Sequence, residues 1–139
     1  MEGFIGQIIM VAFNNPIPQG WALCNGQLLS IEQYNAVYAL LGTQYGGDGV
    51  STFALPDLRG RTTIGQGQSA ETSTTYNLAE TLGSENMTLI NQPGTTHSLT
   101  LSNGPSVAQT GIPAPFSVIQ PSLVVNYLIC LEGVFPSGD

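Results

Sequence analysis

The chain has 139 residues and a formal net charge of −7, and Arg59 and Arg61 are its only strong cations. This length corresponds to one ordinary domain that is large enough to build a hydrophobic core. Because nucleic-acid affinity comes mainly from cations placed on phosphates, the charge argues against DNA or RNA and equally against an anionic membrane surface. Charged residues make up only 8% of the chain, so stability must come from packing and backbone hydrogen bonds.

The first apolar segment covers residues 4–13 and is rich in β-branched and aromatic residues on both faces, which predicts a buried strand. A turn-rich stretch follows, and residues 21–24 are predicted to form a second short strand. No basic region precedes the apolar run, which is too short for a membrane span. We therefore expect no secretion signal and no membrane insertion, so release would require lysis or a dedicated export route.

The clearest helical pattern covers residues 31–41. Ser30 is a suitable N-cap, and Gln33 follows three residues later, as in a capping box. Glycine adopts left-handed conformations easily, so Gly42 is a natural end of the helix. The apolar stripe at helical spacing consists of Ile31, Tyr34, Val37, Tyr38 and Leu41.

A turn-rich segment at residues 45–49 precedes residues 53–58, which carry too many apolar side chains for a solvated loop and are expected to pack down. Residues 59–65 are predicted to be short and extended, which would place Arg59 and Arg61 on the same side. We interpret the arginines as ties to carboxylates or carbonyls near Asp57. A site for an anionic sugar or phosphate is the alternative.

The second half of the chain is more polar and less periodic. Residues 66–82 are predicted to be an exposed loop or insertion, and a short strand is expected within 86–90. Residues 123–131 give the strongest strand pattern. This strand is apolar on both faces, so it is expected to be central in a sheet or covered by another subunit.

These elements predict an α+β fold of mostly β-strands and long loops with one short helix. The expected organisation is a single domain over residues 1–139. It would consist of an N-terminal core part (1–65), a variable loop-rich part (66–120) and a C-terminal strand segment (121–139) that returns to the core.

Catalytic constellations are missing from the sequence. The chain has one histidine, no nucleophile elbow and no phosphate-binding glycine pattern. No pair of carboxylates is spaced for glycan hydrolysis. We therefore expect no enzymatic activity. Cys24 and Cys130 are interpreted as buried free thiols, with a disulfide between the two ends of the chain as the alternative.

Three segments follow one another in a recognisable order. They read Pro-Gln-Gly-Trp-Ala-Leu-Cys-Asn-Gly at 18–26, Phe-Ala-Leu-Pro-Asp-Leu-Arg-Gly-Arg at 53–61 and Asn-Tyr-Leu-Ile-Cys-Leu-Glu-Gly at 126–133. Together they resemble the phage tail-collar domain family, whose bacterial members are often called microcystin-dependent proteins. The resemblance implies the tip of a short tail fibre. Such a tip is an extracellular virion component in which three chains intertwine and contact bacterial surface polysaccharide.

Some members of this family carry a His-x-His pair through which three chains hold a metal ion on the threefold axis. In this chain Thr95 stands in place of the first histidine, and only His97 remains. Threonine is a poor ligand for zinc or iron, so we expect no cofactor. The alternative is a metal held by three copies of His97 on a threefold axis.

The expected function is that of a structural and adhesive protein that binds a cell-surface glycan as a homo-oligomer, most simply a homotrimer. Tyr45, Tyr76 and Phe116 are loop aromatics that suit sugar binding, with packing at subunit contacts as the alternative. Other tail or baseplate proteins are further expected partners. The competing hypothesis is a cell-encoded subunit that self-assembles into a surface filament or particle without a dedicated receptor.

Overall fold

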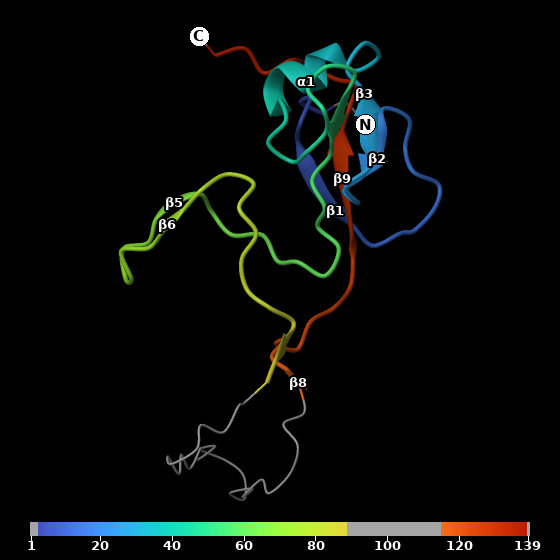
Figure 1. Ribbon diagram of the computed structural model, residues 1–139. Coiled ribbons are helices and arrows are strands. Elements are labelled where there is room, and N and C mark those ends of the chain that lie inside the picture. The colour runs from blue at the N-terminus through green and yellow to red at the C-terminus, as the bar shows by residue number, and fades with distance from the viewer. Residues whose placement is uncertain (1–2, 89–114, 139) are drawn as a thin grey trace, which may run out of the picture. The chain divides into compact units, whose positions relative to one another are not determined.

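The computed structural model describes residues 3–88 and 115–138, and Figure 1 shows their course. The chain divides into two compact units. The first comprises Met1–Thr81 and Leu123–Asp139, and the second comprises Leu82–Ser122. No helix in the described parts of the chain is long and apolar enough to cross a membrane.

A three-stranded antiparallel sheet joins both ends of the first unit. Its strands are β1 (Ile8–Val11), β9 (Asn126–Cys130) and β2 (Trp21–Leu23), in the order β1-β9-β2. Leu128 and Ile129 are fully buried on opposite faces of β9. The prediction of a central position for this two-faced apolar strand is therefore confirmed, although Leu123 and Val124 precede the strand and are exposed.

The prediction that residues 4–13 form a buried strand is wrong. Strand β1 is shorter, lies at the edge of the sheet and leaves Met10 67% exposed. Ile9 and Val11 do pack against buried residues of the sheet, including Leu128. Ile8 and Met10 lie on the other face of β1 and remain partly exposed, because little packs over that face at this edge of the sheet.

The main core lies where α1 meets a second, two-stranded sheet. Strand β3 (Leu28–Ser30) pairs antiparallel with β4 (Thr52–Ala54). Phe53 and Leu55 are fully buried beside Val37 of the helix, and the ring of Tyr38 lies 5.6 Å from that of Phe53. The expectation that residues 53–58 pack down is confirmed at these buried positions.

Helix α1 spans Asn35–Leu41, so it begins four residues later than the predicted 31–41. Residues 31–34 form a turn in which the Tyr34 N–H donates to the Ser30 carbonyl. The backbone N–H of Gln33 lies 3.5 Å from the Ser30 hydroxyl, which is a weak contact, and Tyr34 rather than Ser30 is the N-cap of the helix. Gly42 ends the helix at φ +56°, as predicted, and its N–H donates to the Tyr38 carbonyl.

Two two-stranded antiparallel sheets complete the described structure. Strands β5 (Gly67–Gln68) and β6 (Thr75–Tyr76) pair within the exposed stretch 66–82, which was predicted without strands. In the second unit, β7 (Asn86–Met87) pairs with β8 (Phe116–Ser117), which places a strand within the predicted 86–90. The fold is thus mostly β with one short helix, and the predicted α+β class is confirmed.

Candidate functional site

The loop after α1 is folded around the carboxylate of Asp48. Its Oδ1 accepts hydrogen bonds of 2.8 Å from the backbone N–H groups of Val50, Ser51 and Thr52, and its Oδ2 accepts one from the Ser51 hydroxyl. These donors hold the pKa of Asp48 well below its usual range. Since the carboxylate is engaged by its own loop, it serves to shape the turn.

Asp57 and Arg59 form a two-pronged ion pair. The Nε and Nη2 atoms of Arg59 lie 2.8 and 2.7 Å from the two carboxylate oxygens of Asp57. This pairing lowers the pKa of Asp57 to about 2. The interpretation of Arg59 as a structural tie is confirmed. The expected extended run is wrong, because Gly60 turns the chain at φ +66° between Arg59 and Arg61.

The ion pair stands where two motif-bearing stretches of sequence meet. The Gly26 N–H donates to the Pro56 carbonyl, and the Leu58 N–H donates to the Cys24 carbonyl. Asn25 and Asp57 form an isolated antiparallel bridge. The residues at 18–26 and 53–61 therefore build one continuous scaffold, held together mainly by backbone hydrogen bonds.

Both cysteines are buried and free, so the interpretation as buried thiols is confirmed over the bridged alternative. Burial raises the pKa of Cys24 to about 12, and burial also raises the pKa of Cys130. The Cys130 thiol donates to the Glu132 carbonyl at 3.3 Å. Thiols with a raised pKa carry little thiolate and are poor nucleophiles, so these side chains act as core residues.

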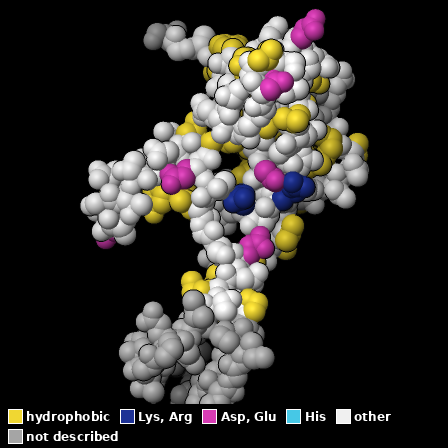
Figure 2. Space-filling model, in the orientation of Figure 1, with side chains coloured by type: hydrophobic (Ala, Val, Ile, Leu, Met, Phe, Trp, Pro, Cys, Tyr) yellow, Lys and Arg dark blue, Asp and Glu magenta, His cyan; other side chains and the backbone are white. Residues whose placement is uncertain are grey.

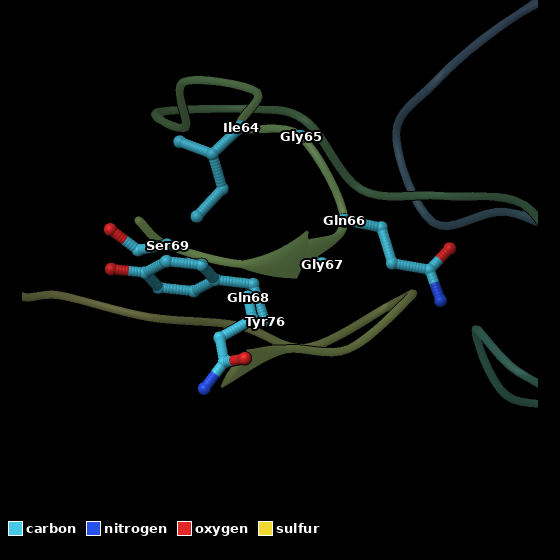
Figure 3. A pocket seen from close by; sticks show the side chains of 7 residues that line it. All are labelled: Ile64, Gly65, Gln66, Gly67, Gln68, Ser69 and Tyr76. Atoms are coloured by element: carbon cyan, nitrogen blue, oxygen red, sulfur yellow. The ribbon is translucent and has the colours of Figure 1, made fainter. Parts of the chain in front are cut away.

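The β5–β6 hairpin carries an open hollow of about 340 Å³ (Figure 3). In this view the side chain of Ile64 points toward the ring of Tyr76, the Ser69 hydroxyl lies beside the phenol end of that ring, and Gln66 points away from it. The lining contains no charged side chain. Its residues are Ile64, Gly65, Gln66, Gly67, Gln68, Ser69 and Tyr76.

Hydrogen bonds within the turn fix the shape of this hairpin. The Ser69 N–H donates to the Thr74 carbonyl at 2.8 Å, and the Ser73 N–H donates to the Ser69 carbonyl at 3.0 Å. Ser73 adopts a positive φ of 59°, and its carbonyl accepts from Nε2 of Gln68. The polar side chains at the tip of the hairpin are therefore held in place by the local backbone.

The aromatic residues proposed for sugar binding lie on different elements. Tyr76 is half-buried on β6 and lines the hollow. Tyr45 is half-buried in the loop after α1, where burial raises its pKa, and it is not part of the lining. Phe116 is exposed on β8 of the second unit. Of the proposed residues, only Tyr76 is placed in this hollow.

Sequence reasoning missed the other residues of the hollow. Ile64 and Ser69 have no periodic pattern, and residues 66–82 were interpreted as a plain loop. The stretch Gly-Gln-Gly-Gln at 65–68 gave no strand signal, because glycine is depleted in strands. Thr95 and His97, the residues weighed for a metal, lie outside the described residues. In residues 3–88 and 115–138, no group of three or more His, Cys, Asp or Glu could hold a metal ion.

Large apolar side chains are exposed on both units, and hydrophobic patches are visible on the face shown in Figure 2. In the second unit, Met87 and Phe116 are directly opposed across β7 and β8, and both are about half exposed. A two-stranded hairpin is marginally stable by itself. In the first unit, the most exposed large apolar side chains of the strands and loops include Phe4, Met10, Leu28, Val50, Leu123 and Val124.

Comparison with protein families gives a match to the first half of the chain. The family model described as Phage Tail Collar Domain matches residues 6–63. The match covers β1, β2, β3, α1 and β4 and includes the Asp57–Arg59 ion pair. It ends immediately before Ile64, the first residue that lines the hollow. No curated protein matches the chain.

Proposed function

We propose that the protein is an adhesive component of a phage tail that binds a cell-surface glycan as a homo-oligomer, because the family model described as Phage Tail Collar Domain matches residues 6–63. The collar domain itself indicates a tail structural protein associated with the virion. The family match carries the proposal. The adhesive role, the glycan and the homo-oligomer are inferences that further features of the chain support.

Exposed apolar side chains support the homo-oligomer. The edge strand β1 presents Met10 to solvent, and the paired strands β7 and β8 present Met87 and Phe116. Apolar surface of this kind is commonly covered by another protein. Copies of the same chain are the simplest cover, since each copy brings the same uncovered strands, and a trimer is the proposed assembly.

Solution mass measurement combined with electron microscopy tests the assembly. A discrete trimer at micromolar concentration supports the proposal. A stable monomer contradicts it, and extended polymers favour the alternative of a self-assembling surface filament or particle.

The chemistry of the surface supports a glycan as the ligand. The chain is rich in hydroxyl and amide side chains but carries only 8% charged residues. Hydroxyl and amide groups donate and accept hydrogen bonds, as the hydroxyls of a saccharide require. Retention of the full chain on immobilised bacterial surface polysaccharide tests this role. Passage without retention on every polysaccharide of a broad panel contradicts it.

We propose further that the protein binds its glycan without cleaving it. The carboxylate of Asp48 accepts hydrogen bonds from the backbone of its own turn, and that of Asp57 is paired with Arg59. Incubation with a retained polysaccharide is expected to release no new reducing ends. Release that a single carboxylate substitution abolishes would show that the protein is a hydrolase.

A further inference from the structure

We propose that the hollow on the β5–β6 hairpin is a subsite for one neutral sugar residue, with the ring of Tyr76 as its stacking platform. This inference rests on the proposed adhesive function and adds to it a place on the chain and a ligand class. The hollow lies beyond residues 6–63, so the family match does not include it.

The apolar wall of the hollow suits the carbon-bound face of a sugar ring. Ile64 points toward the Tyr76 ring in Figure 3, and its side chain is 60% exposed although it is large and apolar. A ligand that covered both side chains would remove this apolar surface from water. An aromatic ring with an apolar body and a polar hydroxyl is well suited to a ligand that is itself amphipathic.

The polar rim supplies partners for sugar hydroxyls. Gln68 also lines the hollow, but its side chain lies on the opposite face of the hairpin from the Tyr76 ring, where its Nε2 donates to the Ser73 carbonyl at 3.2 Å and holds the turn. The Ser69 hydroxyl, beside the phenol end of Tyr76, can donate outward while it accepts a 3.4 Å contact from the Thr72 N–H. A few placed polar groups around an apolar wall are typical of small-ligand sites.

The floor of the hollow is open backbone. A β-carbon added at Gly65 or Gly67 would meet no atom within 4 Å, so the surface beside these two residues is open. Gly67 also has a φ of +128°, which side-chain-bearing residues rarely adopt. Small residues at this position therefore keep the hollow accessible, and they let a ligand approach the main chain.

Charge selects a neutral sugar over an anionic one. None of the lining residues is charged, and the guanidinium of Arg59 is already paired with Asp57. The net charge of −7 repels anions over the chain as a whole. A uronic acid or a phosphorylated sugar would meet no cation in the hollow.

Saturation-transfer NMR on the full chain tests the subsite directly. The probes are the methyl glycosides of glucose, galactose, mannose and N-acetylglucosamine, with that of glucuronic acid as the anionic counterpart. We expect transfer to the ring protons of at least one neutral glycoside and none to the glucuronide. Absence of transfer to all four neutral glycosides would overturn the proposal.

Variants locate the site. Tyr76→Ala is expected to weaken binding of the responding glycoside about tenfold, whereas Tyr76→Phe keeps the ring and most of the affinity. Leu78→Ala is the matched control, because Leu78 is an exposed apolar residue on the same segment outside the lining. Should Tyr76→Ala disturb the hairpin, Ile64→Ala removes an exposed wall residue and is expected to weaken binding severalfold. Unchanged affinity in a folded Tyr76→Ala or Ile64→Ala variant would overturn the proposal.

A parallel assay on immobilised polysaccharide separates this inference from the proposed function. If the polysaccharide retains the wild type and Tyr76→Ala equally, the result supports the adhesive function and contradicts the subsite. If neutral glycosides bind through Tyr76 but no immobilised polysaccharide retains the protein, the result supports the subsite and contradicts the adhesive function.

Discussion

Gly47 passes so close to Phe53 that a β-carbon at position 47 would overlap the backbone of Phe53. Phe53 is fully buried at the centre of the main core, and Gly47 has a φ of +96°. The loop after α1 can therefore lie against β4 only with glycine at this point. The contact joins the turn-rich stretch 45–49 to the core, although the two segments look unrelated in sequence.

Gly47→Ala is predicted to lower the free energy of unfolding by about 3 kcal/mol or more, since it combines a backbone clash with a φ that alanine rarely adopts. Urea denaturation followed by tryptophan fluorescence measures the change. Gly65→Ala is the control, because a β-carbon there meets open space, and its effect is expected to stay within about 0.5 kcal/mol. Equal stability of both variants would contradict the packing described for Gly47.

Acid is predicted to weaken the fold through Asp48. Its pKa lies well below the usual value of about 4, so its contribution to stability is fully present above that value. The contribution is lost as the pH falls toward the lowered pKa of the folded state. Asp48→Asn is expected to be less stable than wild type near neutral pH and to lose less stability between about pH 4 and pH 2. Parallel pH profiles for the two proteins would contradict the role of the carboxylate.

Met10→Glu is predicted to weaken the homo-oligomer. Met10 is 67% exposed on an edge strand, so a carboxylate there costs little in a monomer but is costly when a second chain covers it. Sedimentation velocity over a dilution series is expected to show dissociation at a concentration at least about tenfold higher than for wild type. Asn14→Asp adds the same charge in the exposed turn beyond β1 and serves as control. An unchanged assembly in Met10→Glu would exclude this face from the subunit contact.

Metal content is predicted to be negligible. The prediction comes from the sequence alone, since Thr95 replaces a possible ligand and a single His97 per chain supplies few donors. Elemental analysis of protein prepared without added metal is expected to find well under one zinc or iron ion per three chains. One ion per three chains, released in His97→Ala, would establish a shared site on a threefold axis.

The sequence predicts correctly the central strand, which has a clear apolar pattern, and the end of the helix, which has a glycine. The pattern at 123–131 is apolar on both faces, and β9 is the central strand, whose two faces are packed by separate hydrophobic clusters. Gly42 ends α1, as glycine at that place predicts. The pattern at 4–13 is equally apolar, yet β1 lies at an edge. Composition alone does not distinguish a strand covered within its own chain from one that leaves a face open.

Most residues of the hollow on the β5–β6 hairpin could not be predicted from the sequence. Tyr76 was identified as a loop aromatic residue, but its neighbours in the hollow are set by the pairing of Gly67 with Tyr76 and of Gln68 with Thr75. Such two-residue strands have almost no periodicity to detect. The start of α1 was missed for a related reason, since the Ser30 and Gln33 pattern suits an isolated turn as well as a helix.

The central proposal is that this chain, whose residues 6–63 match the tail collar family model, is an adhesive homo-oligomer. Sedimentation velocity of the purified full chain with a panel of bacterial surface polysaccharides tests this proposal most directly. We predict a discrete trimer that co-sediments with at least one polysaccharide of the panel. A monomer that sediments independently of every polysaccharide would contradict the account.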